Sequence, residues 1–128
     1  MLAVEVANRS GVEVAERATG EVARRVLAAE NVPDGEVSIT FVTPEEIRAL
    51  KRDHLGVDEV TDVLAFPIDG RAGGEDGVPR HIGDVVLCPV VVGEAWQGAL
   101  VHGLLHLLGY EHGEEMRERE RRHGGGLT

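Results

Sequence analysis

The chain has 128 residues and a formal net charge of −10, and 42% of its residues are hydrophobic. This length suffices for one domain, residues 1–128, and the negative charge argues against a general nucleic-acid binder, whose affinity for phosphate comes from clustered lysine and arginine. The sequence shows neither an apolar run of about 18 residues nor a basic-then-apolar start, so it predicts no membrane span and no secretory signal. Its single cysteine excludes an internal disulfide bond, and the cytoplasm is the expected compartment.

The first half of the chain predicts two strands, each followed by a helix. In residues 2–7, large apolar side chains alternate with small or charged ones, and residues 12–30 carry apolar side chains at helical spacing. Residues 37–42 alternate again. Residues 43–46, Thr-Pro-Glu-Glu, have the form of a capping box with proline at the first helical position, so a helix is expected to begin at this proline and to end near Gly56.

The second half predicts two more strands and two helices. Residues 61–66 and 82–87 favour strands, the latter interrupted by Gly83, and the glycine-rich residues 68–80 between them predict a flexible surface loop. A helix over 94–108 is apolar on nearly every side and is expected to be buried. The following helix, 114–122, alternates glutamate with arginine, which is typical of a solvated, salt-bridged face.

The order of these elements is too irregular for a doubly wound fold. It predicts an α+β fold, loosely α/β, in which helices pack on a single mixed four-stranded β-sheet. The apolar helix over 94–108 is the expected central helix, and it carries two of the three histidines described next.

Three histidines near the C-terminus, His102, His106 and His112, carry the strongest functional pattern. His102 and His106 are four residues apart, so on a helix their imidazoles project from one face. Gly109 is expected to end the helix in a left-handed conformation, which lets His112 turn back as a third ligand. Three imidazoles leave a fourth position for water, the arrangement of a catalytic zinc site, although imidazole also suits other transition metals.

The spacing matches H-E-x-x-H-x-x-G-x-x-H, the signature of metzincin proteases, with one difference. Gly103 stands where those enzymes carry the glutamate that acts as general base. The pattern therefore keeps the metal ligands of a hydrolase and lacks the base of a protease.

Three blocks of the chain resemble the YbeY family of bacterial endoribonucleases. Besides the segment from His102 to His112, residues 61–67 (T-D-V-L-A-F-P) resemble the family's T-[DN]-V-L-S-F-P, and residues 82–85 (I-G-D-V) resemble its L-G-D-I. The blocks occur in the family's order and spacing, and the resemblance covers essentially the whole chain.

This resemblance implies a metal-dependent endoribonuclease specific for single-stranded RNA. It implies action in 3′-end maturation of 16S rRNA, in ribosome biogenesis and in quality control, with the small ribosomal subunit or its assembly factors as partners. It also implies one zinc ion per chain, bound by His102, His106 and His112. The oligomeric state, the natural cleavage site and the metal used in the cell are not indicated.

Four positions depart from the family pattern. Ala65 replaces the usual serine, Glu111 replaces an aspartate, and Gly98 stands where many members have a histidine. Leu55 stands where many members have an arginine that is implicated in RNA cleavage, and the catalytic set therefore stays open.

Several residues are candidates to complete the site. Glu111, adjacent to a metal ligand, either orients an imidazole or accepts a proton, or is simply an exposed carboxylate on a turn. Lys51, Arg52 and Arg80 are candidate RNA phosphate contacts, with solvated surface as the alternative. Asp62 either lines the site or caps a turn.

Two other functions remain open at this point. One is a metallopeptidase-like hydrolase, and the other is a non-catalytic ribosome-assembly factor in which zinc is structural. The leading hypothesis is hydrolysis of an RNA phosphodiester, with zinc lowering the pKa of a water toward about 7 and polarising a phosphoryl oxygen.

Overall fold

The computed structural model describes residues 2–72 and 78–124. The chain forms, in order, β1 (Leu2–Asn8), α1 (Glu16–Ala29), β2 (Gly35–Phe41), α2 (Pro44–Leu55), β3 (Val63–Pro67), β4 (His81–Leu87), α3 (Pro89–Val92), a 3-10 turn (Gly93–Ala95), α4 (Trp96–Leu107) and α5 (Glu114–Arg122). Within the described ranges, every helix is too short or too polar to cross a membrane.

The strands form one four-stranded sheet in the order β1-β2-β4-β3. β1 and β2 are parallel, as are β2 and β4, whereas β3 pairs with β4 in the antiparallel sense. The predicted single mixed sheet and its α+β class are therefore confirmed. β3 is an edge strand beside β4. Helix α4 packs on both strands, so residues at the start of β3 lie next to α4.

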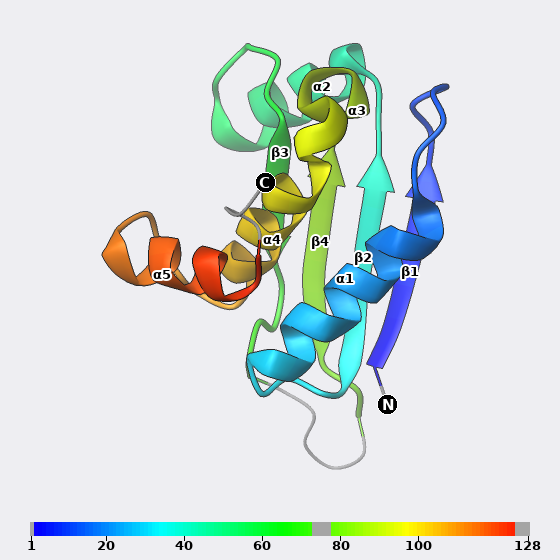
Figure 1. Ribbon diagram of the computed structural model, residues 1–128. Coiled ribbons are helices and arrows are strands. Elements are labelled where there is room, and N and C mark those ends of the chain that lie inside the picture. Colours follow the sequence, from blue (N-terminus) through cyan, green and yellow to red (C-terminus); the bar gives the residue numbers. More distant parts are fainter. Residues whose placement is uncertain (1, 73–77, 125–128) are drawn as a thin grey trace.

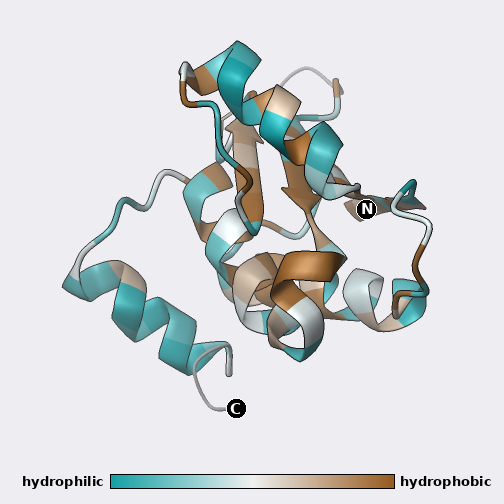
Figure 2. Ribbon diagram, turned by 90° about the horizontal axis from the view of Figure 1, so that it is seen from above, coloured by the Kyte–Doolittle hydropathy of each residue, from teal (hydrophilic) through white to brown (hydrophobic). Residues whose placement is uncertain are grey.

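Helices cover both faces of the sheet. α1 and α4 pack side by side on one face, where they enclose the main core with inward-facing residues such as Val85 and Leu87 of β4 (Figure 1). Val86 and Cys88 alternate to the other face, where Ile47 of α2 covers a smaller apolar cluster. Figure 2 shows the apolar segments gathered around the strands and α4, whereas α5 is mainly hydrophilic.

Three local predictions differ from the structure. The first helix begins at Glu16 rather than Val12, because Asn8 and Ser10 hold the preceding residues in a turn: the Asn8 side chain donates to the Val12 carbonyl at 2.7 Å. β4 runs through Gly83 instead of being interrupted there, with a shift of register against β2. The strand ends before Pro89 as expected, but the sequence did not predict that Pro89 begins the short helix α3, which it can do because proline suits the first helical position.

Only the ends of the predicted loop over 68–80 can be compared with the structure, since residues 73–77 lie outside the described ranges. These ends are attached to the rest of the fold. The Asp69 carboxylate accepts a hydrogen bond from the His81 backbone at 2.8 Å, and the Arg71 guanidinium donates to the Glu30 carbonyl at 2.6 Å.

Candidate metal centre

Helix α4 holds the first two histidines against the sheet. Its residues Leu100, Leu104 and Leu105 are fully buried, and the helix packs on β3, β4 and α1, as expected of an apolar helix. His102 and His106 lie one turn apart and half-buried at its accessible side. Their Nε2 atoms are 3.1 Å apart, close to the roughly 3.3 Å that separates two nitrogens bound tetrahedrally to one zinc ion.

The end of α4 brings the third histidine back toward the first two. Gly109 has φ +98°, a left-handed conformation that favours glycine. Its backbone N–H donates to the His106 carbonyl at 3.0 Å, and that of Tyr110 donates to the Leu105 carbonyl at 3.1 Å, which is the Schellman pattern of a helix C-terminus. The chain reverses at Gly109 as the sequence predicts, and His112 follows three residues later.

The three imidazoles converge on one another. One ligand nitrogen from each of His102, His106 and His112 lies within 4.8 Å of the other two, and the ring centroids are 4.6–5.0 Å apart. In the described part of the chain, this is the one group of three or more histidine, cysteine or acidic residues close enough to share an ion. The residues present therefore fit a divalent metal with three imidazole ligands.

The lowered pKa of His106 also suits a metal ligand. Burial, followed by the positive charges of His102 and His112, lowers the pKa of His106, while a hydrogen bond with the Tyr110 backbone and the charge of Glu120 oppose this shift. His106 is thus favoured in its neutral form, the form that binds metals. Nδ1 of His102 lies 3.2 Å from Oε2 of Glu120. This pairing uses Nδ1 and leaves Nε2 of His102, which faces the other histidines, as the nitrogen that could bind a metal.

The histidines line an open cavity of about 820 Å³ between α4, the start of β3 and the end of α2. Apolar walls come from residues such as Val63, Val91 and Ala95. Polar groups at the lining include Lys51, Thr61, Asp62 and Glu120. A cavity of this kind can admit a chain-like substrate to a metal at its wall.

The candidate RNA-binding residues are distributed unequally. Lys51 lines the cavity and forms an ion pair with Glu59 at 2.6 Å. Arg52 is exposed beside Asp53, and Arg80 pairs with Asp34 at 2.9 Å before β2, so neither belongs to the lining. The structure thus places one of the three predicted cations at the cavity that the histidines line.

The two acidic candidates, Asp62 and Glu111, differ in their position relative to the cavity. Asp62 lines the cavity, and its carboxylate accepts a hydrogen bond from the Val63 backbone N–H at 2.8 Å, at the start of β3. Glu111 is exposed and lies outside the lining formed by the described residues. Its position in the sequence, next to His112, remains the basis of its proposed role.

Sequence reasoning missed Glu120. The alternation of glutamate and arginine places it on a solvated helix face, yet its side chain is only 26% exposed and contacts His102. Nothing local could reveal this contact, because the two residues are 18 positions apart and meet only after the chain reverses at Gly109. The solvated-face prediction is therefore wrong at this position.

Four positions without a polar side chain shape the site. Leu55, which is 57% exposed, Ala65 and Gly98 all line the cavity, so three of the four departures from the YbeY pattern lie at the site itself. Gly103 packs against the sheet, where a Cβ atom would lie 2.8 Å from Cγ1 of Val85 and 3.2 Å from Cγ2 of Val63. The backbone therefore lacks room at Gly103 for the glutamate of the protease signature.

Comparisons with known proteins agree with this site. A family model described as "Endoribonuclease YbeY" matches residues 4–124. An Endoribonuclease YbeY of Acidothermus cellulolyticus is 42% identical over 93% of this chain and 84% of its own length, and one of Geobacillus kaustophilus is 44% identical over 72% of this chain and 70% of its own.

The fold has a solved counterpart as well. The solution structure of TM1509 from Thermotoga maritima superposes with a TM-score of 0.61 at 24% identity, over 94% of this chain and 85% of that one. At this identity the superposition concerns the fold alone. Taken with the match to residues 4–124 and the 42% identity to a relative of known name, the three convergent histidines place this chain in the YbeY endoribonuclease family.

Proposed function

We propose that this chain is a zinc-dependent endoribonuclease that cleaves single-stranded RNA and acts in 3′-end maturation of 16S rRNA. Residues 1–128 form one catalytic domain, with one zinc ion bound by His102, His106 and His112. The substrate is the 16S precursor in the cytoplasm, and the small ribosomal subunit or its assembly factors are partners. The observation that carries the proposal is the convergence of three imidazoles at the wall of an open cavity, in a chain related to endoribonucleases.

The charge distribution favours a local RNA contact. The net charge of −10 repels phosphates from most of the surface, so binding has to depend on the metal and on nearby cations. Lys51 is the cation at the cavity lining, whereas Arg52 and Arg80 could contact only flanking phosphates. Apolar walls beside Leu55 and Val91 suit unpaired bases better than a duplex.

Each residue then has a distinct role. When bound, a zinc ion would lower the pKa of a water molecule and polarise a phosphoryl oxygen with its positive charge. Glu120 orients His102 through Nδ1, Lys51 holds a phosphate, and Glu111 accepts a proton during hydrolysis.

The two glutamates are distinguished by replacing each with alanine. Glu120→Ala is expected to weaken metal binding by roughly 10- to 100-fold, as loss of a ligand-orienting carboxylate does. Glu111→Ala is expected to bind metal like the wild type but to lower kcat by about 10²- to 10⁴-fold, the usual contribution of a general base. Metal titration and steady-state RNA cleavage measure the two effects. Wild-type kcat in Glu111→Ala would remove that residue from the catalytic set.

The function itself is tested with a single-stranded RNA carrying the 3′-end precursor sequence of 16S rRNA and with the same sequence in a duplex. Purified protein is expected to contain about one zinc per chain, to cleave only the single strand, to stop after chelation and to resume when zinc returns. Cells lacking the protein are expected to accumulate unprocessed 16S 3′ ends. A chelated protein that still cleaves would refute the metal-dependent mechanism.

The two other functions are less well supported. A metallopeptidase would need a base near the position of Gly103, where the sheet leaves no room for a side chain. An assembly factor with structural zinc would not need an open cavity beside the ligands. Peptide cleavage without RNA cleavage would favour the first, and zinc-dependent folding without RNA cleavage would favour the second.

A further inference from the structure

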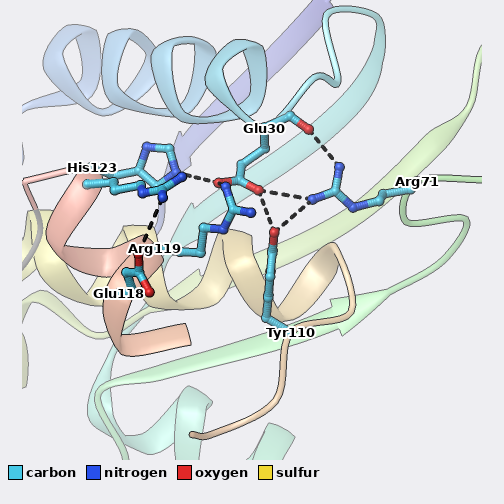
Figure 3. Close-up of polar contacts among 7 residues, drawn as sticks. Glu30, Arg71, Tyr110, Glu118, Arg119 and His123 are labelled. Atoms are coloured by element: carbon cyan, nitrogen blue, oxygen red, sulfur yellow. Dashed lines mark hydrogen bonds and ion pairs between the residues drawn. The ribbon is translucent and has the colours of Figure 1, made fainter. Parts of the chain in front are cut away.

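Among the residues that the structure describes, Glu30 is the one acidic residue that is buried, with 3% of its surface exposed. It follows α1, far from the histidine segment in sequence, and lies among residues from three other stretches (Figure 3). An isolated carboxylate at such a position would be strongly destabilising, so its partners have to neutralise it.

Both oxygens of the Glu30 carboxylate are fully engaged. Oε1 accepts hydrogen bonds from the Tyr110 hydroxyl at 2.8 Å and from the Arg71 guanidinium at 3.0 Å. Oε2 lies 2.7 Å from Nε2 of His123 and 3.6 Å from Nη1 of Arg119. Burial alone would raise the pKa of Glu30, but the hydrogen bonds from His123 and Tyr110, the charge of Arg119 and the hydrogen bond from Arg71 hold it below its usual value.

These partners flank the metal centre in the chain. Tyr110 lies two residues before His112, and Arg119 is the neighbour of Glu120, which contacts His102. Glu30 therefore holds the segment from Tyr110 to His123 at both ends. That segment has few other attachments, since Met116 is the one buried residue of α5 and the rest of this helix is charged.

We propose that Glu30 is a positioning residue of the metal centre. By binding Tyr110, Arg119 and His123, it fixes the C-terminal segment so that His112 reaches the other two histidines and Glu120 reaches His102. The inference rests on the proposed function, because it assumes that the three histidines bind a metal. Glu30 itself touches neither the ion nor the substrate.

The proposal is tested with Glu30→Gln, which keeps the size of the side chain and removes its charge. Glu21→Gln, at an exposed position of α1, the helix that Glu30 follows, is the matched control. Binding of Co²⁺ alone is followed by its visible absorption, and melting temperatures are measured with and without the metal. Glu30→Gln is expected to bind Co²⁺ roughly 10-fold or more weakly, within the range for groups that orient ligands, and Glu21→Gln is expected to bind it like the wild type.

Two further readouts separate positioning from general destabilisation. A purely structural residue would lower the melting temperatures of the metal-free and metal-loaded proteins equally, whereas a positioning residue reduces the difference between them. The Co²⁺ spectrum of Glu30→Gln is also expected to change shape, because His112 no longer holds the same place. With saturating metal, kcat should fall more than KM rises.

Tyr110→Phe provides a second variant if Glu30→Gln does not fold. It removes only the hydroxyl that donates to Glu30 and is expected to weaken Co²⁺ binding in the same direction by a smaller factor. Wild-type affinity and spectrum in Glu30→Gln, or in Tyr110→Phe where the former is unfolded, would overturn the positioning role. Absence of Co²⁺ binding by the wild-type protein would instead refute the metal site, and with it the proposed function.

Discussion

Replacing His106 with alanine is expected to abolish stoichiometric metal binding and to lower RNA cleavage by more than about 100-fold. The estimate is a lower bound, because loss of a group that merely orients a ligand already lowers affinity or activity by up to about 100-fold. The fold should survive, since His106 is only half-buried and its neighbours on α4 supply the apolar contacts. Elemental analysis, circular dichroism and cleavage of single-stranded RNA measure the three properties.

His81→Ala is the matched control for this variant. His81 is exposed at the start of β4 and lies outside the cavity lining formed by the described residues, so its loss should leave metal content and cleavage unchanged. A folded His106→Ala protein that retains zinc and cleaves RNA like the wild type would contradict the proposed centre. A folded variant that fails to process 16S rRNA would argue against a purely structural metal.

Replacing Gly83 with alanine is expected to lower the free energy of unfolding by about 2–4 kcal/mol, the sum of overpacking and backbone strain. A Cβ atom there would lie 2.6 Å from the Phe66 carbonyl oxygen and 2.8 Å from Cδ2 of Leu107, and the backbone has φ +151°. Because Leu107 follows His106 on α4, the variant is also expected to disturb metal binding. Denaturant unfolding and metal titration measure both effects.

Replacing Gly20 with alanine should instead raise the free energy of unfolding. Gly20 lies within α1, where a Cβ atom would meet only a methyl group of Val6 at 4.0 Å, so alanine there should stabilise by roughly 0.5–1 kcal/mol through its helix propensity. Equal stability of Gly83→Ala and the wild type would show that β4 and α4 can separate at this point without loss.

Much of the fold was predictable because its information is local. Period-two alternation in residues 2–7 and 37–42 marked strands, and Thr43 with the following proline marked the start of α2, where the Thr43 side chain accepts a hydrogen bond from the Glu46 backbone at 3.1 Å. The shift of the start of α1 to Glu16 arises from side-chain hydrogen bonds that compete with helix formation, which propensity alone does not resolve.

The metal centre was likewise predictable where it depends on neighbouring residues. The four-residue spacing of His102 and His106 and the glycine that ends their helix are properties of a short stretch of chain, so the sequence predicted their convergence with His112. The parallel and antiparallel pairings of the strands instead depend on contacts between distant segments, and the order of the predicted elements restricted them only to a mixed sheet.

The sequence by itself thus determined the element types, the histidine cluster and the family to which the chain belongs. Only the tertiary structure decided which other side chains reach the site, as with Glu120 beside His102, and that Glu30 contacts His123 although 93 positions separate them in the chain. The physical reason is that helix and turn preferences act over about four residues, whereas these contacts arise when α1, α4 and α5 pack together around the sheet.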